Sequence, residues 1–388
     1  MSFQSNHIIN PRLSYWEQVS FFKEIDVAVI GSGIVGLSAA IHLKTLSSKL
    51  KVAVFERGSL PAGASTRNAG FACFGSMTEL IDDLEKHSED EVFDLVEKRW
   101  NGLERLREKI GDKKLGYLEF GGFELFKSDE EAAFQKCAQK LTDFNEKLFE
   151  ISGKKTNYSL QDNLIQQFGF KGVSHLILNS GEGQIHTGMM MKSLLDLAKE
   201  LGVELFTGIN ITDFEDKGNR IKLISQNDWE IDASKLIIAT NGFAKQLIPE
   251  LDVKPARNQV LITKPIDDLP FEGCFHYDKG YYYFRNIDQR ILLGGGRNLA
   301  IEKEMTSSFG TTELIQNALI KLLKEVILPT KTFEIDTWWS GILGVGASKK
   351  TIVKNHSENV FLAVRMGGMG VAIGSLIGEE VAQLVYDS

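Results

Sequence analysis

The sequence predicts an α/β fold, α+β overall, in which two glycine-rich turns lie far apart in the chain. An apolar strand at 25–30 runs into the glycine turn at 31–36, and a helix and a second strand follow. A second glycine-rich turn between a strand and a helix stands at 365–374. Between them, 250–335 contains runs typical of antiparallel strands. The economical explanation is that the two turns line the two ends of one large ligand.

The glycine turn at 31–36 is typical of a dinucleotide site. Gly31 permits the tight turn, Gly33 lets a pyrophosphate approach the backbone, and Gly36 lets the helix pack on the strand. The first helical N–H groups then face the phosphates, where the helix dipole favours negative charge. Glu56 follows at about the 20-residue spacing of an acid that accepts hydrogen bonds from a ribose. Without these neighbours, the pattern would indicate only a glycine turn in an ordinary strand–helix–strand unit.

Composition and charge narrow the class of protein. The 388 residues are enough for two or three domain-sized cores, and 43% hydrophobic with 25% charged residues is ordinary for a globular enzyme. The formal net charge is −8 and no basic stretch is present, which argues against nucleic acid as the main partner.

Cysteine usage and hydropathy indicate the compartment. Cys73, Cys137 and Cys274 are widely spaced, so we expect neither a disulfide framework nor a metal cluster. No signal pattern stands at 1–24, and no run approaches the ~20 apolar residues of a membrane span. We therefore expect a cytoplasmic protein without a transmembrane segment.

The stretch 57–73 has the composition of a loop wrapped around a polar ligand. It combines glycines and hydroxyls with an arginine and an asparagine, and Ser65, Thr66 and Arg67 can contact phosphate oxygens. The alternative is a long surface loop, but the apolar residues 71–74 would not end a free loop.

Three further predictions concern local structure. The apolar strand at 236–239 ends in the polar turn 240–242, as a buried parallel strand does at a ligand crevice. Tyr15 and Trp16 are expected to cover a hydrophobic edge of the first domain. The alternation at 117–126 around two glycines predicts a β-hairpin.

Taken together, these motifs make the chain resemble the FAD-dependent oxidoreductases of the D-amino acid oxidase type, the group with glycine, sarcosine and γ-glutamylputrescine oxidases. The resemblance covers nearly the whole chain in the right order. It rests on GSGIVG at 31–36, Glu56-Arg57, GASTRNAG at 63–70, ATNG at 239–242, PARNQ at 255–259, YYYFR at 281–285, GGGRN at 294–298, WSG at 339–341 and GGMGVAIG at 367–374.

The resemblance implies a Rossmann-like FAD-binding domain and a substrate domain with a mostly antiparallel sheet. The FAD-binding domain is expected from 1–76, 186–248 and 337–388, and the substrate domain from 77–185 and 249–336. Covalent members carry cysteine or histidine at set places, and the flavin-linked cysteine of sarcosine oxidase falls near 342–344, which here is Ile-Leu-Gly. FAD is therefore expected to be bound noncovalently, and no metal is expected.

The resemblance also implies which residues contact FAD. The first glycine turn holds the pyrophosphate, the acid the adenosine ribose, and the loop at 65–70 the path toward the flavin ring. The backbone at 211 reaches the adenine, 239–242 form the floor, and 367–371 approach the pyrimidine end of the flavin. The expected residues are Gly31, Gly33, Ile34, Gly36, Glu56, Arg57, Ser65, Thr66, Arg67, Asn68, Ala69, Gly70, Ile211, Ala239, Thr240, Asn241, Gly242, Gly367, Gly368, Met369, Gly370 and Val371.

The expected reaction is oxidation of the C–N bond of an amine or amino acid. A neutral amine gives a hydride to flavin N5, the imine is hydrolysed, and oxygen or another acceptor takes the electrons. An aromatic wall of Phe71, Tyr281, Tyr283 and Trp339 would favour the unprotonated amine by desolvation, although each aromatic alone is equally well explained as core. Arg285 is expected to contact the substrate or the flavin edge, with a surface position as the alternative.

One departure from the family bears on the substrate. Glycine oxidase and D-amino acid oxidase carry an arginine just after the glycine matched by Gly341, where it clamps the substrate carboxylate. This chain has Ile342, so a simple α-amino acid would need Arg285 or Arg257 as a substitute clamp. The alternatives are a hydroxy acid or alcohol dehydrogenase, which needs an alkoxide-forming base, and a flavin- or NAD-binding protein without turnover.

Overall fold

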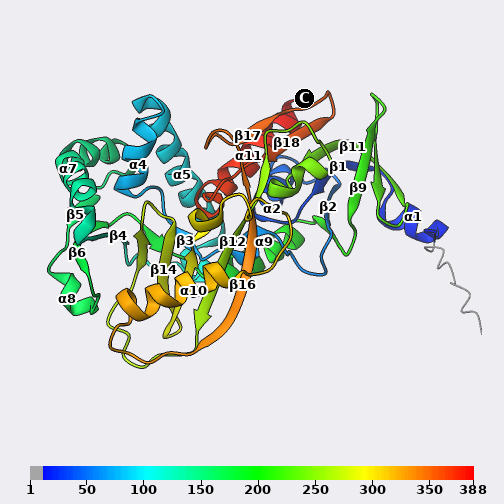
Figure 1. The fold of residues 1–388 in the computed structure, drawn as a ribbon. Coiled ribbons are helices and arrows are strands. Elements are labelled where there is room, and N and C mark those ends of the chain that lie inside the picture. The colour runs from blue at the N-terminus through cyan, green and yellow to red at the C-terminus, as the bar shows by residue number, and fades with distance from the viewer. Residues whose placement is uncertain (1–11) are drawn as a thin grey trace, which may run out of the picture.

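Two eight-stranded sheets organise the computed structural model, which describes residues 12–388 (Figure 1). The first has the order β17-β18-β11-β1-β2-β8, with β10 on β11 and β9 on β10. Its strands are β1 (Ile25–Ile30), β2 (Val52–Glu56), β8 (Glu204–Thr207), β9 (Ile211–Asp216), β10 (Ile221–Ser225), β11 (Glu230–Ile238), β17 (Ile352–Asn355) and β18 (Val360–Val364).

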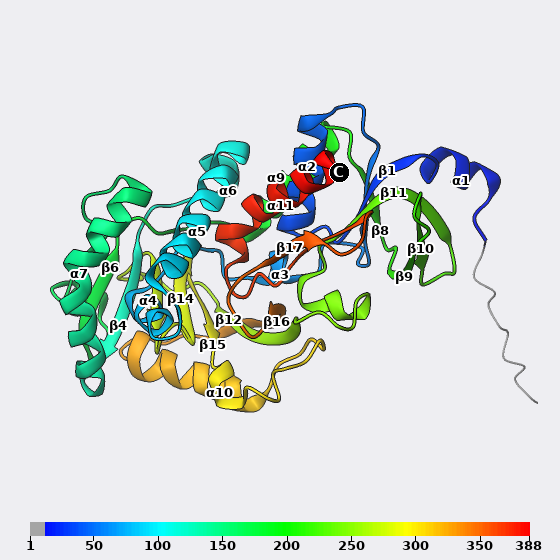
Figure 2. The same ribbon diagram turned by 90° about the horizontal axis from the view of Figure 1, so that it is seen from above.

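Parallel pairing at the centre of the first sheet explains its apolar strands. β1 lies between β2 and β11 and pairs with both in parallel, and β8 and β18 extend the parallel part. One face is covered by the helices α2 (Ile34–Leu46), α9 (Thr187–Glu200) and α11 (Gly370–Asp387), which lie together in Figure 2. The other face packs under β9, β10 and residues 244–253. Strands covered on both faces must be apolar throughout.

The second sheet has the order β16-β12-β15-β14-β13-β4-β6-β5. β13 and β4 pair in parallel, and the other neighbours pair antiparallel. Its strands are β4 (Gly122–Lys127), β5 (Tyr158–Leu160), β6 (Val173–Asn179), β12 (Lys254–Thr263), β13 (Cys274–Tyr277), β14 (Tyr282–Ile287), β15 (Arg290–Gly295) and β16 (Ile335–Val345). A short third sheet pairs β3 (Phe71–Ala72) with β7 (Gly183–Gln184).

The remaining helices include five that pack around the second sheet. Stacked and edge-to-face phenylalanines fill the core under α8 and α10, and α4, α5 and α7 enclose another cluster. These helices are α1 (Tyr15–Phe21), α3 (Ala64–Arg67), α4 (Met77–Leu84), α5 (Glu89–Ile110), α6 (Asp112–Leu115), α7 (Glu131–Ser152), α8 (Leu164–Phe168) and α10 (Glu313–Leu322), with short turns η1 (Ser128–Glu130), η2 (Asn241–Gln246), η3 (Arg297–Ala300) and η4 (Leu323–Ile327).

The predicted fold class is confirmed, with a largely parallel sheet under helices and a mostly antiparallel second sheet. The strands of the first sheet come from the three chain segments expected to bind FAD. β16 is different: it belongs to the second sheet, although 337–345 fall in the expected third FAD segment. Residues 1–11, where the first expected segment begins, lie outside the described residues.

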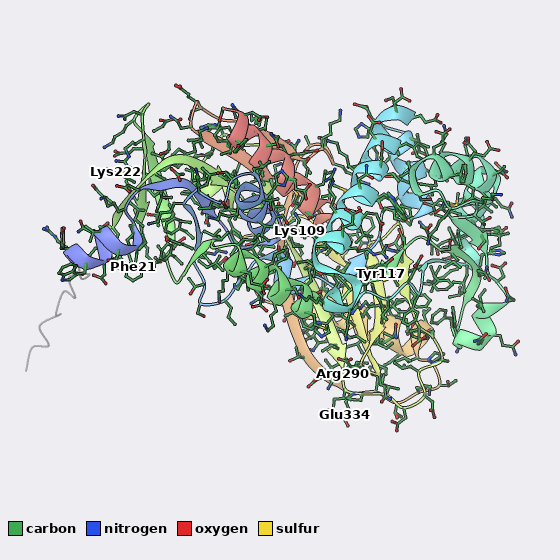
Figure 3. The ribbon with its side chains drawn as sticks, turned by 180° about the vertical axis from the view of Figure 1, so that it is seen from behind. Phe21, Lys109, Tyr117, Lys222, Arg290 and Glu334 are labelled. Carbon is green, nitrogen blue, oxygen red and sulfur yellow. The ribbon has the colours of Figure 1, made fainter. Side chains whose placement is uncertain are left out.

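Two local predictions are wrong. Residues 117–126 form no hairpin within the described chain, because β4 pairs with β6 and β13 instead. Tyr15 and Trp16 do not cover a hydrophobic edge, since they are 68% and 73% exposed. Their helix has no buried residue and lies at the outer edge of the molecule, where Figure 3 labels Phe21. Phe22, just after the helix, packs instead against the rings of Phe55 and Phe206 in the first sheet.

Candidate active site

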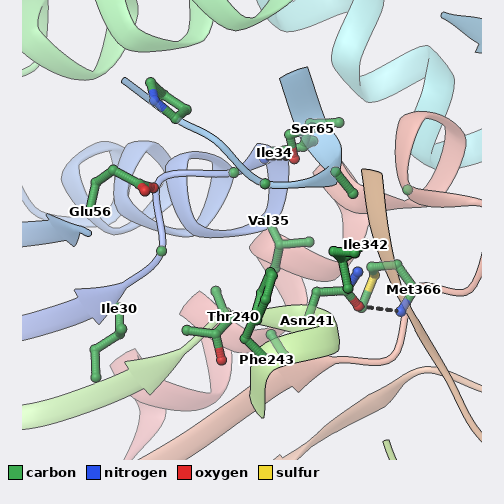
Figure 4. A pocket seen from close by; sticks show the side chains of 18 of the residues that line it. Ile30, Ile34, Val35, Glu56, Ser65, Thr240, Asn241, Phe243, Ile342 and Met366 are labelled. Atoms are coloured by element: carbon green, nitrogen blue, oxygen red, sulfur yellow. Dashed lines mark hydrogen bonds between the residues drawn. The ribbon is translucent and has the colours of Figure 1, made fainter. Parts of the chain in front are cut away.

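A cleft runs along the carboxyl ends of the parallel strands β1, β11 and β18 (Figure 4). It encloses about 1250 Å³ of empty space, part of it open to solvent. Residues of both glycine turns line the cleft, so it suits a long ligand. The crevice outside the carboxyl ends of parallel strands is where open α/β sheets bind ligands.

The first glycine turn shapes one end of this cleft. Gly31 has φ +104°, a conformation that favours glycine. At Gly36 an added Cβ would lie 1.9 Å from the Gly31 carbonyl oxygen, so only glycine lets α2 pack this close. Ser65 Oγ accepts a hydrogen bond from the Ile34 N–H at 3.0 Å and would lie 2.8 Å from a Cβ on Gly33. The turn and the 63–70 loop therefore meet at the start of α2.

Glu56 ends β2 with its carboxylate in the cleft, as Figure 4 shows. Its Oε2 accepts hydrogen bonds from the Ser32 hydroxyl at 2.7 Å and the Ser32 N–H at 3.3 Å, and its Oε1 accepts one from the Gly58 N–H at 2.9 Å. A carboxylate offers about four lone-pair sites, so one acceptor site remains for a ligand hydroxyl.

The other end of the cleft is formed by the turn before α11. Asn241 Oδ1 accepts a hydrogen bond from the Met366 N–H at 3.0 Å, which ties the end of β11 to this turn. α11 lies close against α2 because Gly374 and Gly378 face it, and a Cβ on Gly378 would lie 2.6 Å from the Ser38 Cβ. Two helix N-termini therefore open into one cleft, where both dipoles favour negative charge.

Most of the expected cofactor residues line the cleft. Those that do are Gly31, Gly33, Ile34, Glu56, Arg57, Ser65, Asn68, Ile211, Ala239, Thr240, Asn241, Gly367, Gly368, Gly370 and Val371. The cleft also contains residues that the sequence reasoning missed, among them Asn210, Phe243, Met366 and Leu343. Phe243 follows the expected floor directly, and the Arg57 guanidinium stacks on its ring at 3.8 Å.

The other expected cofactor residues support the cleft from behind. Gly36 provides the helix contact described above, and Gly242 packs against the Leu343 carbonyl. Ala69 and Gly70 lie deeper, toward the second sheet. The Thr66 hydroxyl donates to carbonyl oxygens of its own loop. The Arg67 guanidinium donates to the Ala62 and Ser340 carbonyls. Met369 Sδ lies 2.8 Å from the Nε of buried Arg99. Arg99 had no distinguishing sequence signal, because its partners lie far away in the chain.

Three of the expected aromatic residues meet on the face of the second sheet that is turned toward this loop. Phe71 and Tyr283 contact edge to face, with ring centroids 5.6 Å apart. The Trp339 indole N–H donates to the Arg67 carbonyl at 3.0 Å. All three pack on one apolar cluster, and burial raises the pKa of Tyr283 to about 12, so its phenol stays protonated. We call Phe71, Tyr283 and Trp339 the aromatic wall.

Two expected substrate residues lie elsewhere. Tyr281 is 37% exposed and belongs to the turn before β14 rather than to the strand that carries Tyr283. Arg285 is 2% exposed, which excludes the surface alternative. Its NH1 donates to the carbonyls of Gly70 at 2.9 Å and Ile185 at 2.7 Å, so this nitrogen is not an open contact for a substrate.

The other possible clamp is also occupied. Arg257 donates two hydrogen bonds of 2.8 Å to the carboxylate of Glu304, which is 0% exposed. Ile342 lines the cleft at the position where some family members carry an arginine. Arg257 and Arg285 are therefore both bound within the protein.

The cleft and the sheets define a class of protein: an α/β protein with a dinucleotide-type cleft at the carboxyl ends of parallel strands and a mostly antiparallel second sheet beside it. The family of FAD dependent oxidoreductases called DAO matches residues 26–384, and the chain belongs to this family. FAD is the cofactor of this family and therefore of this chain. In the described chain, no helix has both the length and the apolar character needed to cross a membrane.

Individual relatives are distant but cover almost the whole chain. The probable oxidoreductase OrdL of Haemophilus influenzae is 23% identical over 385 residues, covering 94% of this chain and 83% of that protein. The γ-glutamylputrescine oxidoreductase of Escherichia coli K12 is also 23% identical, covering 93% and 83%. The fold is similar to that of glycine oxidase from Bacillus cereus ATCC 14579, with a TM-score of 0.74, 17% identity, and 94% and 95% of the two chains covered.

The residues of the cleft fit FAD. Two helix N-termini suit its phosphates and the flavin edge, and Glu56 has an acceptor site free for a ribose hydroxyl. The hydroxyl of Thr240 is buried in the cleft wall without a hydrogen-bond partner among the described residues, which is expected where a polar ligand supplies one.

Proposed function

We propose that the protein oxidises the C–N bond of a small-molecule amine, with FAD bound noncovalently. The observation that carries this proposal is the aromatic wall of Phe71, Tyr283 and Trp339 beside the cofactor loop. When bound, FAD supplies the acceptor of a hydride from the carbon next to nitrogen. The imine product is then hydrolysed by water.

The aromatic wall prepares the substrate for this step. An apolar surface lowers the pKa of an amine that it desolvates, so a larger fraction of the amine is neutral and carries a free nitrogen lone pair. The neutral phenol of Tyr283 adds no charge that would hold an ammonium ion. The backbone N–H groups at Gly370 and Val371, which begin α11 and line the cleft, would stabilise negative charge on the flavin edge when FAD is bound.

The occupied guanidinium groups favour an amine without a required α-carboxylate. Arg285 donates to backbone carbonyls, Arg257 pairs with Glu304, and Ile342 replaces the arginine found in some relatives. An α-carboxylate therefore has no strong partner among these three positions. We expect amines to reduce the flavin faster than the matching α-amino acids.

Noncovalent binding is supported by the chemistry of the cleft. No cysteine or histidine is among the residues of 12–388 that line it. Acid precipitation should therefore release all the flavin into the supernatant as FAD. Yellow colour that stays with the washed protein pellet would contradict noncovalent binding.

The test of the reaction is anaerobic reduction of the bound flavin by a panel of amines, the matching α-amino acids and the matching hydroxy acids. We expect bleaching by amines, and subsequent reoxidation with oxygen or an artificial acceptor identifies the acceptor. Bleaching by hydroxy acids alone would refute amine oxidation and support the hydroxy acid dehydrogenase alternative. A protein that binds FAD but is reduced by no member of the panel would also contradict the proposal.

A matched pair of variants tests the aromatic wall. Tyr283 and Tyr282 are adjacent on β14 and face opposite sides, Tyr282 toward the core under α10. Tyr283→Ala should slow flavin reduction about tenfold at neutral pH if the wall lowers the amine pKa by about one unit. The deficit should vanish above the amine pKa, where the substrate is neutral without help. Tyr282→Ala should leave the rate unchanged, and an equal deficit in both variants would contradict the role of the wall.

A further inference from the structure

A second cluster of reactive side chains lies behind the aromatic wall. Cys73 Sγ, a carboxylate oxygen of Glu182 and a ring nitrogen of His276 all lie within 4.8 Å of one another. Cys274 Sγ is 3.3 Å from the Gly183 carbonyl oxygen, which Cys73 Sγ also approaches at 3.9 Å. The proposed amine oxidation uses none of these four side chains.

The fold brings together residues that are far apart in the sequence. Cys274 and His276 alternate on β13 and so point to one face of the second sheet. Cys73 directly follows β3, which pairs with β7 next to Glu182. The neighbouring strand β4 makes room for the carboxylate, because a Cβ on Gly122 would lie 1.9 Å from Glu182 Oε2. Two cysteines that are widely spaced in the sequence therefore approach the same carbonyl oxygen, that of Gly183.

The hydrogen bonds within the cluster leave the Nε2 atom of His276 unpaired. Glu182 Oε1 accepts from the N–H groups of Phe74 at 2.9 Å and Gly75 at 3.0 Å, which fixes the carboxylate. Its Oε2 lies 3.7 Å from His276 Nε2. That nitrogen is buried and has no hydrogen-bond partner in the part of the chain that the structure describes. A buried polar atom left without a partner is destabilising, so its position needs an explanation.

The buried positive charge of Arg285 lies beside the same cluster. Arg285 stands opposite Cys274 in the β13–β14 pair and is buried, with carbonyl oxygens as the acceptors of its hydrogen bonds. The Arg285 Nε is also buried and has no hydrogen-bond partner among the described residues. A buried cation is costly unless an anion compensates it. Negative charge on the two sulfurs would provide that compensation.

We propose that Cys73, Cys274, His276 and Glu182 bind a thiophilic divalent cation, best matched by Zn²⁺. Thiolate, imidazole and carboxylate groups are the ligands that zinc prefers. Two thiolates, one carboxylate and a neutral imidazole around a dication leave one negative charge, which Arg285 neutralises. The protons of the two thiols and any proton on the imidazole are released as the metal binds.

The geometry indicates a structural rather than a catalytic ion. Zinc bonds of about 2.0–2.3 Å place tetrahedral ligand atoms within about 4 Å of one another. The ligand atoms of Cys73, Glu182 and His276, which lie within 4.8 Å of one another, therefore have to close only slightly around the ion, and Cys274 Sγ has to move in beside Cys73 Sγ to join them. Four protein ligands leave no open position for water or substrate. The ion would join the segment after β3 to β13 and so fix Phe71, which contacts the His276 ring at 5.2 Å.

The experiment is metal binding by the FAD-loaded protein under reducing conditions. The protein is treated with a chelator, dialysed and titrated with Co²⁺, whose ligand-field bands lie to the red of the flavin bands. We expect one equivalent of tetrahedral Co²⁺ with a thiolate charge-transfer band, displaced by Zn²⁺. Cys73→Ser and His276→Gln should lose this spectrum. Cys137→Ser, at a buried cysteine on α7 in a separate cluster, should retain it.

The wild-type titration decides the proposal even where a variant fails to fold. Wild-type protein that takes up no stoichiometric Co²⁺ or Zn²⁺ would overturn it. So would a Cys73→Ser variant that keeps the full cobalt spectrum. A disulfide between Cys73 and Cys274 that persists in the reduced protein and excludes metal would overturn it as well.

Discussion

Replacement of Glu56 by glutamine tests how the cleft holds the adenosine end of FAD. The carboxylate already accepts three hydrogen bonds, two from Ser32 and one from Gly58, which leaves one of about four acceptor sites for a ribose hydroxyl. A hydrogen bond to a charged group contributes about 1.5–3 kcal/mol. Loss of that one bond should weaken FAD binding by about 10- to 150-fold, at about 1.4 kcal/mol per factor of ten.

The assay is titration of flavin-free protein with FAD, followed by quenching of the flavin fluorescence. Ser32→Ala is the matched control, because it removes a hydroxyl that donates to Glu56 but does not line the cleft. It should cost about 1 kcal/mol of protein stability and change FAD affinity little. Equal FAD affinity of Glu56→Gln and wild type would refute the assignment of Glu56 to the ribose. Equal losses in both variants would show that the effect comes from the turn and not from a ribose contact.

Three further predictions concern stability. Phe22→Ala should lower the free energy of unfolding by about 2–3 kcal/mol, somewhat less than the loss at a fully buried phenylalanine. Trp16→Ala should change it by less than about 0.5 kcal/mol, because Trp16 is exposed. Similar losses for the two variants in urea unfolding would contradict the packing described for Phe22 and α1. Arg257→Met should lower the free energy of unfolding by about 3–5 kcal/mol, because it leaves the Glu304 charge buried and unpaired. The Michaelis constant for the amine should stay unchanged. A raised Michaelis constant would make Arg257 a substrate contact. Burial lowers the pKa of His175, but hydrogen bonds to two carboxylates raise it more. The stability that His175 adds relative to His175→Gln should therefore be complete below about pH 6.5 and decline as the pH rises further. A stability difference that is constant with pH would contradict this.

The parts of the site that were predictable depend on local sequence. Glycines at fixed spacing after an apolar run determine a turn by steric rules, so 31–36 and 367–374 could be placed before any contact was known. Glu56 could be placed because it ends the second apolar run, and the end of that strand lies at the cleft. These signals come from the backbone and need no knowledge of distant partners.

The parts that were not predictable depend on long-range contacts. Alternation places Tyr281, Tyr283 and Arg285 on one side of an extended strand, but β14 begins one residue after Tyr281, which turns away into solvent. Arg285 ends against carbonyls from residues far away in the sequence. The meeting of Cys73 with Cys274 likewise follows from sheet order and not from their spacing.

A crystal structure of the FAD-bound protein with an amine inhibitor would show directly where the substrate lies. We expect the pyrophosphate at Gly31 and Gly33, the flavin ring near the turn at 367–371, and the inhibitor nitrogen between that ring and the aromatic wall. A flavin ring bound away from Phe71, Tyr283 and Trp339, or an inhibitor held by Arg285 or Arg257, would contradict it.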